Sequence, residues 1–229
     1  MASFPRPLMI DTYKNVLVLI PHPDDEAIGC GGLLAKLAQQ GANIKAILVS
    51  DGSGDGGLPE GISTIREQEF IASLDILGVR DYECWGLLDG HLSTDEQLTV
   101  LLKTAIKAYS PDLIIAPWHE DMHPDHSTVG NSIKEQASCV LADILYYEVW
   151  TPLVCTHFLD ISDVVTLKQN AILEHKTALN YGHYLEGIMG LARYRALYLP
   201  FGKTLKYAEA YHLHIKKTKG WFDFLWTKH

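Results

Sequence analysis

The amino-acid sequence predicts an α/β protein with a mostly parallel sheet flanked by helices. Over the first two thirds of the chain, short apolar runs alternate with helical patterns, as in βαβ units. The run 15–20, Asn-Val-Leu-Val-Leu-Ile, is rich in β-branched residues and lacks polar alternation, which is typical of a parallel strand buried on both faces. Clusters of His and Asp follow two such runs directly. Because open α/β sheets bind ligands at the carboxyl edge of their strands, we expect a functional site there.

The individual elements follow from this alternation. Each expected strand is a short apolar run, and the five in this part are Asn15–Ile20, Ile44–Ser50, Tyr82–Trp85, Leu113–Ala116 and Ile144–Glu148. Each expected helix lies between two strands, and the four are Glu26–Gln40, Thr64–Leu77, Asp95–Ala108 and Pro124–Cys139. Ser63 is expected to cap the second helix and Gly78 to end it. The third is expected to open at Ser93 or Thr94 and to stop at Ser110-Pro111.

The pattern changes beyond Trp150. A short strand is expected at His157–Ile161, followed by amphipathic helices at Val164–Leu179 and Tyr184–Leu197 and a final strand at Tyr207–Ile215. No low-complexity linker or internal repeat interrupts the chain. We therefore expect one domain over residues 1–229, with a core of about residues 14–150 and a C-terminal part, 151–229, that completes the pocket.

Composition excludes several classes of protein. The net charge of −9 argues against nucleic acid as a partner, because nucleic-acid binding needs a positive field. The four cysteines are widely spaced and form no CxxC pair, which predicts free thiols in a reducing compartment. Residues 1–14 lack the apolar core of a signal peptide, and no run approaches the roughly 18 apolar residues of a transmembrane helix. We expect a soluble cytoplasmic protein without a membrane partner.

Two His-Pro-Asp triplets carry the strongest chemical signal. His22 and Asp25 follow the first strand at a spacing of three, which places both side chains on one side of a helical turn. His123 and His126 repeat this spacing after the strand at Leu113–Ala116, and either could supply a third ligand. Two imidazoles and one carboxylate suit zinc, and three protein ligands leave one position open, as in catalytic sites.

The neighbouring acidic residues then have candidate roles in hydrolysis. Asp24 lies beside the ligands but points away from them, so it is the expected general base for an activated water. The histidine that is not a ligand could stabilise an oxyanion or protonate a leaving amine. Asp125 could orient that histidine and raise its pKa.

Weaker signals surround this centre. Arg66 lies in the first turn of a helix, where a cation is unfavourable, which favours a task such as holding substrate oxygens over simple pairing with Glu69. Asp89 follows the third strand and could bind hydroxyls or simply form a turn. The glycine-rich segment 51–57 matches neither the dinucleotide fingerprint nor the P-loop, and a substrate loop and a flexible turn remain equal readings.

These residues resemble the LmbE-like, or PIG-L-type, family of zinc-dependent N-acetylglucosaminyl deacetylases. The resemblance rests on Pro21–Glu26, on His123–His126, on Arg66 with Glu69, and on Tyr207–Ala210. It implies a Rossmann-like fold and removal of the acetyl group from an N-acetylglucosamine-type conjugate, whose carrier the sequence does not reveal. It also implies possible assembly into trimers or hexamers.

Carried over to this chain, the resemblance assigns His22, Asp25 and His126 to the metal and Asp24 to the general base. It implies that His123, tuned by Asp125, acts on the oxyanion or as an acid. Arg66 and Asp89 look like positions that contact sugar hydroxyls. Some relatives carry a mobile tyrosine where this chain has Asp121, so a role for that tyrosine does not transfer.

Two rival functions remain. Two histidines and one carboxylate are also the facial triad of non-haem iron oxygenases, so Fe²⁺ or another divalent metal could replace Zn²⁺. The βαβ alternation counts against that reading, because such oxygenases normally use β-barrels. The second rival is a non-catalytic metal- or sugar-binding module. Asp24, His123 and Asp125 count against it, since binding alone does not need them.

Overall fold

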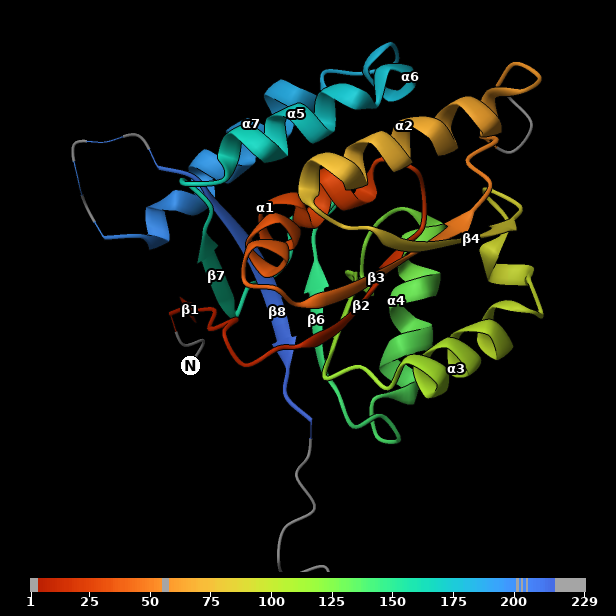
Figure 1. Ribbon diagram of the computed structural model, residues 1–229, viewed down its shortest axis with the longest axis horizontal. Helices are drawn as coiled ribbons and strands as arrows, with labels where there is room; N and C mark the ends of the chain where they lie inside the picture. Colours follow the sequence, from red (N-terminus) through yellow and green to blue (C-terminus); the bar gives the residue numbers. More distant parts are fainter. Residues whose placement is uncertain (1–3, 55–57, 201, 203, 205, 217–229) are drawn as a thin grey trace, which may run out of the picture.

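The computed structural model describes residues 4–54, 58–200, 202, 204 and 206–216. Within these residues, eight strands form one sheet of order β1-β7-β8-β6-β5-β2-β3-β4 (Figure 1). The strands are β1 (Arg6–Pro7), β2 (Asn15–Ile20), β3 (Asn43–Ser50), β4 (Asp81–Leu87), β5 (Leu113–Pro117), β6 (Asp143–Tyr147), β7 (His157–Asp160) and β8 (Ala208–His214). Every pairing is parallel except those of β8 with β6 and β7. The predicted mostly parallel sheet is confirmed.

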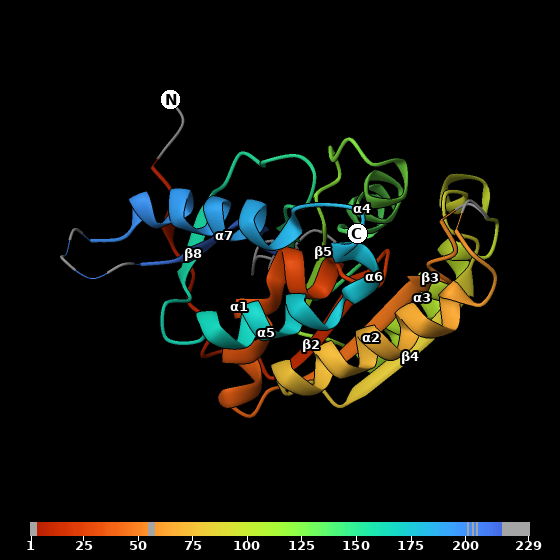
Figure 2. The ribbon, with the colours of Figure 1, turned by 90° about the horizontal axis from the view of Figure 1, so that it is seen from above.

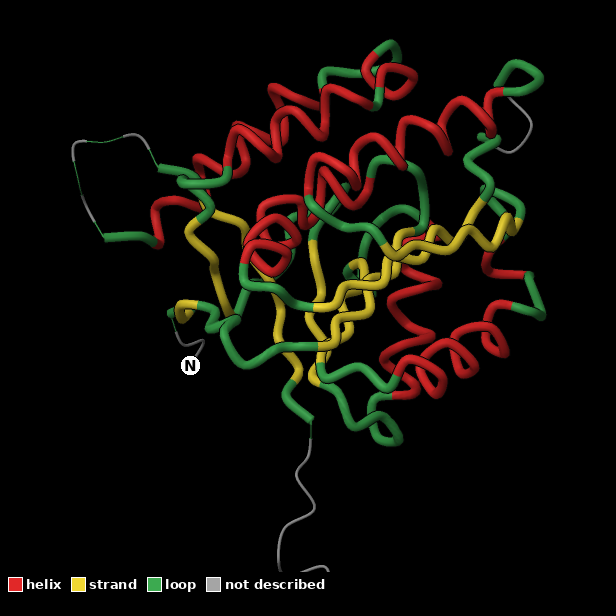
Figure 3. The backbone as a smooth tube through the Cα atoms, viewed as in Figure 1, coloured by secondary structure: helices red, strands yellow, loops and turns green. Residues whose placement is uncertain are grey.

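Helices cover both faces of the sheet (Figures 1 and 2). One face carries α1 (Asp25–Gln39), α2 (Ile62–Leu77), α5 (Val165–Glu174), α6 (Lys176–Leu179) and α7 (Tyr184–Arg195). The other carries α3 (Leu98–Tyr109) and α4 (Pro124–Gln136). Figure 3 shows the resulting three layers, with the strands running between the two groups of helices. No helix within the described residues has the length and apolar character needed to cross a membrane.

The interior strand β2 packs against both layers of helices. Its side chains alternate between two cores: Val16, Val18 and Ile20 join the core beneath α1, while Leu17 and Leu19 join the core beneath α3 and α4. All five are fully buried. Whatever follows β2 is therefore held on a well-packed support.

The order of the strands creates a crevice at the end of β2. From β2 the chain crosses α1 to β3 on one side, whereas β5 pairs with β2 on the other side. The connections on the two sides of β2 therefore diverge, and the carboxyl ends of β2 and β5 border the opening between them. Open α/β sheets bind ligands at such a topological switch point.

Helix boundaries differ from the expectations where a turn replaces a side-chain cap. The cap predicted at Ser63 is wrong, because α2 begins at Ile62, two residues earlier than expected, after Gly61 with a φ of 80°. Gly78, also with a φ of 80°, ends α2 as predicted. The predicted start of the third helix at Ser93 or Thr94 is wrong, since these residues form a 3₁₀ turn and α3 begins at Leu98.

The C-terminal part contributes two strands to the same sheet, but its first helix is divided. The predicted helix 164–179 breaks at His175 into α5 and α6, and Nε2 of His175 lies 2.6 Å from Oε1 of Glu26. We attribute the break to this inward contact. The short strand β1, which pairs with β7, had no signal in the sequence.

Candidate metal centre

Three side chains with metal-binding atoms converge beyond the carboxyl ends of β2 and β5. His22 follows β2, Asp25 begins α1, and His126 lies in the first turn of α4. Nδ1 of His22 is 3.0 Å from Nε2 of His126 and 3.3 Å from Oδ2 of Asp25. The same Asp25 oxygen is 3.1 Å from Nε2 of His126. The three atoms form a nearly equilateral triangle, and all three side chains are buried.

The size of this triangle fits a divalent cation. For zinc bonds of about 2.0–2.1 Å, tetrahedral geometry places neighbouring ligand atoms about 3.3–3.4 Å apart. Three lone pairs directed at one point repel one another unless a cation lies between them. His123 is the alternative ligand that spacing left open. Its ring nitrogen lies within 4.8 Å of those of His22 and His126, which is a looser arrangement.

In both histidines of the triangle, the nitrogen that points away from its centre faces a carboxylate. Nε2 of His22 is 3.2 Å from Oδ2 of Asp125 and 3.2 Å from Oδ1 of Asp89. Nδ1 of His126 is 3.6 Å from Oδ1 of Asp121. A proton held on the outer nitrogen leaves the lone pair of the inner nitrogen free for a metal, and carboxylates usually hold metal-binding histidines this way.

Charge at the centre also favours a cation. Burial acts to lower the pKa values of both ligand histidines, but the surrounding carboxylates outweigh it and raise the pKa of His126 to about 9 and that of His22 well above its usual range. Conversely, the imidazoles of His126 and His22 overcome burial and hold the pKa of Asp25 well below its usual range. The carboxylates therefore stabilise positive charge at the centre of the triangle, and one metal ion bound there would provide the charge that two protonated imidazoles otherwise carry.

Asp24 is held beside the triangle in a strained backbone conformation, with a φ of 146°. Its N–H donates to Oε2 of Glu26 at 3.2 Å, and Glu26 is itself fixed by the Ser73 hydroxyl and by His175. Nη2 of Arg66 lies 3.6 Å from Oδ2 of Asp24. Burial, followed by the charge of Asp25, raises the pKa of Asp24 to about 7. Strain of this kind persists only where surrounding contacts hold it, which is common at functional sites.

His123 is positioned by the start of α4. It is the N-cap residue, and its Nδ1 accepts the N–H of Asp125 at 3.3 Å. In the neutral ring the proton is then on Nε2. Burial and the neighbouring His22 and His126 lower the pKa of His123, so the neutral form is favoured.

The carboxylate of Asp125 does not form the pair with His123 that the sequence suggested. It instead accepts the N–H groups of Gly90 and Leu92, at 2.7 and 3.2 Å, and contacts Nε2 of His22. The charge of Asp125 does act to raise the pKa of His123, as expected, but burial and two nearby imidazoles outweigh it and the pKa is lowered. The carboxylate of Asp125 therefore contacts His22 of the triangle and not His123.

A break in α1 separates the turn that carries Asp24 and Asp25 from the rest of the helix. Cys30 has non-helical backbone angles, φ −144° and ψ 20°. The Ile28 carbonyl accepts Nζ of Lys168 at 2.8 Å, and the N–H of Gly32 donates to Glu209 at 2.8 Å. These two backbone groups would bond to each other in a regular helix.

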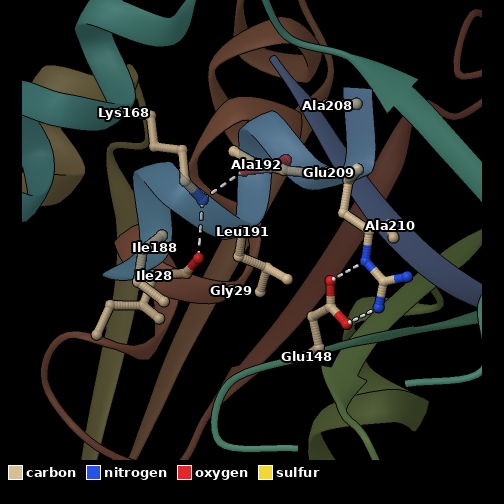
Figure 4. A pocket seen from close by; sticks show the side chains of 11 residues that line it. Ile28, Gly29, Glu148, Lys168, Ile188, Leu191, Ala192, Ala208, Glu209 and Ala210 are labelled. Atoms are coloured by element: carbon tan, nitrogen blue, oxygen red, sulfur yellow. Dashed lines mark hydrogen bonds and ion pairs between the residues drawn. The ribbon is translucent and has the colours of Figure 1, made fainter. Parts of the chain in front are cut away.

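Lys168 and Glu209 are themselves a buried ion pair, with Nζ and Oε1 2.6 Å apart (Figure 4). Glu209 also accepts the N–H of Leu33 at 2.8 Å and the hydroxyl of Tyr211 at 2.6 Å. The ion pair therefore provides hydrogen-bond partners for the backbone groups on both sides of the break, which burial would otherwise leave unpaired.

The triangle opens into a cavity of 200 Å³, which we call the metal pocket. Arg66 and Asp89, the predicted substrate contacts, both line it. Arg66 does not pair with Glu69; Nη1 donates to the Gly52 carbonyl at 2.8 Å. Gly54 is the one residue of segment 51–57 on the pocket wall, and residues 55–57 lie outside the described residues.

Sequence reasoning missed the residues that support the site from a distance. Asp121 stood out in the sequence only as the position where some relatives carry a tyrosine, yet it faces His126 and accepts the backbone N–H groups of Trp150 and Thr151, each at 3.1 Å. Lys168 belongs to an amphipathic helical pattern and had no signal at all. Its partner Glu209 was noted only within the motif 207–210.

Comparisons with known proteins identify the family of the chain. The family model described as PIG-L, GlcNAc-PI de-N-acetylase, matches residues 17–137, more than half of the chain. A diacetylchitobiose deacetylase of Thermococcus kodakarensis is 29% identical over 191 residues, which cover 72% of this chain and 70% of that protein.

Solved structures share the fold. N,N′-diacetylchitobiose deacetylase from Pyrococcus horikoshii has a TM-score of 0.78 at 21% identity, over 93% of this chain and 89% of that one. A 4-carboxy-2-hydroxymuconate hydratase from Pseudomonas putida has a TM-score of 0.77 at 20% identity, over 90% and 98%. At these identities the two likenesses show the fold alone, and the hydratase shows that this fold supports more than one reaction.

Proposed function

The chain belongs to the PIG-L family of GlcNAc-PI de-N-acetylases, and on that premise we propose that it is a metal-dependent N-deacetylase. Its substrate is an N-acetylglucosamine-type amino-sugar derivative, which it hydrolyses to acetate and a free amine. One observation carries the proposal: the buried triangle of His22, Asp25 and His126, with Asp24 held beside it.

Zinc is the metal we propose for this triangle. Two imidazole nitrogens and one carboxylate oxygen at these separations match tetrahedral zinc with one position left for water. A divalent cation in this place supplies Lewis acidity, which lowers the pKa of water and polarises the amide carbonyl. Fe²⁺ accepts the same ligands, so metal content must be measured and not assumed.

The residues around the metal divide the work of proton transfer. Asp24 takes a proton from the attacking water and is placed to return it to the departing amine nitrogen. His123 donates its Nε2 proton as a hydrogen bond to the carbonyl oxygen as negative charge develops there. Because His123 is neutral in this arrangement, a hydrogen-bonding role is favoured over that of a strong acid.

Asp125, Asp89 and Asp121 act through the ligands. Asp125 and Asp89 hold His22, and Asp121 faces the outer nitrogen of His126. Arg66 and Asp89 also line the metal pocket, which supports the proposal that they contact sugar hydroxyls.

We also propose that the chain works as one domain, since β7 and β8 extend the sheet and Tyr184 reaches the metal pocket. Assembly into a trimer or hexamer stays a prediction.

Acetate release from N-acetylglucosamine derivatives by zinc-loaded protein tests this function. Asp24→Asn keeps the shape of the side chain but removes the base, and we expect kcat to fall about 10²–10⁴-fold with zinc content unchanged. His126→Gln should lower the zinc content itself. Asp163→Asn, at an exposed aspartate that pairs with Lys36, is the matched control and should behave as wild type.

Two outcomes would overturn the proposal. Bound iron with substrate-dependent oxygen consumption would indicate the oxygenase. Stoichiometric zinc and tight sugar binding without acetate release would indicate the binding module.

A further inference from the structure

A second cavity of 370 Å³ adjoins the metal pocket. The two cavities are adjacent, because Ile28, Val149, Trp150 and Tyr184 contribute to both walls. The metal pocket alone, at 200 Å³, is smaller than the about 300–1,000 Å³ typical of ligand sites. A substrate whose acetyl group reaches the metal pocket therefore has space beyond it for the group attached to the amino sugar.

Aromatic side chains dominate the outer wall of this cavity. Trp150 is 48% exposed and Tyr181 is 65% exposed. The rings of Trp150 and Tyr184 lie edge to face, 5.8 Å apart. Among the described residues, no side chain or backbone group hydrogen-bonds the indole of Trp150 or the hydroxyls of the two tyrosines. The cavity wall therefore offers aromatic ring faces, together with an indole N–H and two phenol hydroxyls that are free to hydrogen-bond a ligand.

The described wall of this second cavity contains no Lys, Arg, Asp or Glu; His183 is its one histidine. Arg and Lys are the side chains that most often pair with a phosphate or carboxylate. Arg66 lines the metal pocket instead and already donates to the carbonyls of Gly52 and Pro23. The lining therefore suits a neutral group.

The aromatic wall is preorganised by buried polar contacts. The backbone N–H of Trp150 donates to Asp121, which also faces His126 of the triangle. Glu148, two residues earlier, forms a double hydrogen bond with Arg195 of α7, at 2.9 and 2.5 Å (Figure 4). The segment that carries Trp150 is thus tied both to the metal centre and to the helix that forms the other wall.

We propose that this cavity is a subsite for a neutral pyranose ring linked to the amino sugar. A pyranose presents C–H groups on its face, which pack against aromatic rings, and hydroxyls at its rim, which pair with indole and phenol groups. The substrate is then an oligosaccharide of N-acetylglucosamine type and not a conjugate with an anionic carrier. This inference rests on the proposed deacetylase function and specifies its substrate.

Gly187 offers a way to fill the cavity without disturbing the fold. It lines the cavity within α7, and a Cβ at this residue would meet nothing within 4 Å. Gly187→Leu therefore projects into the cavity, and leucine is favoured over glycine in a helix. Gly190, one turn along the same helix, also has open space at its Cβ but does not line the cavity. Gly190→Leu is the matched control.

The experiment compares kcat/KM for N,N′-diacetylchitobiose, N-acetylglucosamine and N-acetylglucosamine 1-phosphate. We expect wild type to prefer the disaccharide, and Gly187→Leu to lower the disaccharide-to-monosaccharide ratio of kcat/KM by about tenfold or more. Gly190→Leu should leave all three values unchanged. Calorimetric titration of the disaccharide into zinc-loaded Asp24→Asn, with and without Gly187→Leu, gives a readout that does not depend on turnover.

Preference for the phosphate, or an unchanged ratio together with unchanged calorimetric affinity, would overturn the subsite while leaving the deacetylase function intact. Failure of wild type to release acetate from any of the three compounds, with zinc bound, would count against the proposed function instead. In that case the calorimetric comparison still decides whether the cavity binds the sugar.

Discussion

The ion pair at the break in α1 predicts an asymmetry between two substitutions. Lys168→Met removes the donor to the Ile28 carbonyl but leaves Glu209 with three other donors, Gly32, Leu33 and Tyr211. Breaking a buried pair costs about 3–5 kcal/mol in the free energy of unfolding, and this case belongs at the lower end, about 3 kcal/mol, because the remaining carboxylate stays hydrogen-bonded.

Glu209→Gln should cost more, about 4–5 kcal/mol. Four donors surround this carboxylate, whereas a glutamine amide offers one acceptor oxygen and turns its own N–H groups toward the others. It also leaves Lys168, which is 1% exposed, as a buried charge without its partner. The double variant should cost less than the sum of the two single variants, since no uncompensated charge remains.

Urea denaturation of the two single variants, the double variant and Lys36→Met measures these differences. Lys36 lies in α1 and pairs with Asp163 at the surface, so Lys36→Met should lower the free energy of unfolding by less than about 1 kcal/mol. The reasoning is refuted if Glu209→Gln costs no more than Lys36→Met, or if the costs of the two single variants simply add.

Two further substitutions test buried contacts. Glu26 outweighs burial and raises the pKa of His175, so their contribution is complete below about pH 6.5 and is lost as the pH rises through the raised value. The difference in unfolding free energy between wild type and His175→Gln should therefore shrink from pH 6 to pH 9; a constant difference in urea titrations would contradict this. A Cβ at Gly29 would overlap the buried ring of Tyr147, so Gly29→Ala should lower the free energy of unfolding by more than about 2 kcal/mol. A Cβ at Gly190 has open space, so Gly190→Ala should raise it by about 0.5–1 kcal/mol. Equal melting temperatures for the two variants would argue against the packing at Gly29.

The sequence predicted best those elements whose burial leaves a local pattern. The bounds of β2 match the expectation because all but its first residue are fully buried, so the run is continuous and ends at a proline. Boundaries set by turns were harder to predict. Ser63 is chemically a good cap, but the αL turn at Gly61 starts α2 earlier, and local composition does not distinguish the two.

For the candidate site, the sequence predicted that two clusters meet but not what holds them. The two clusters come together because β2 and β5 are neighbours, which two strand-then-cluster patterns indicated. Spacing left His123 and His126 as alternatives, and the choice of His126 came from the family resemblance. The contact of Asp125 with His22 and not His123 depends on the turn after β4, whose path no short-range pattern specifies. Lys168 and Glu209 are 41 residues apart, so their pairing is a property of the folded chain alone.

The position of the ligands in the chain has a consequence for folding. His22 and His126 are 104 residues apart in sequence, and all four cysteines are free. A cation joining the two ligand loops acts as a reversible cross-link, comparable in reach to a disulfide that closes a loop of about 100 residues, for which chain entropy gives about 4.7 kcal/mol. Chelation should therefore loosen the chain as reduction loosens a disulfide-bonded protein, and each tenfold rise in free metal above its Kd should add about 1.4 kcal/mol to the free energy of unfolding.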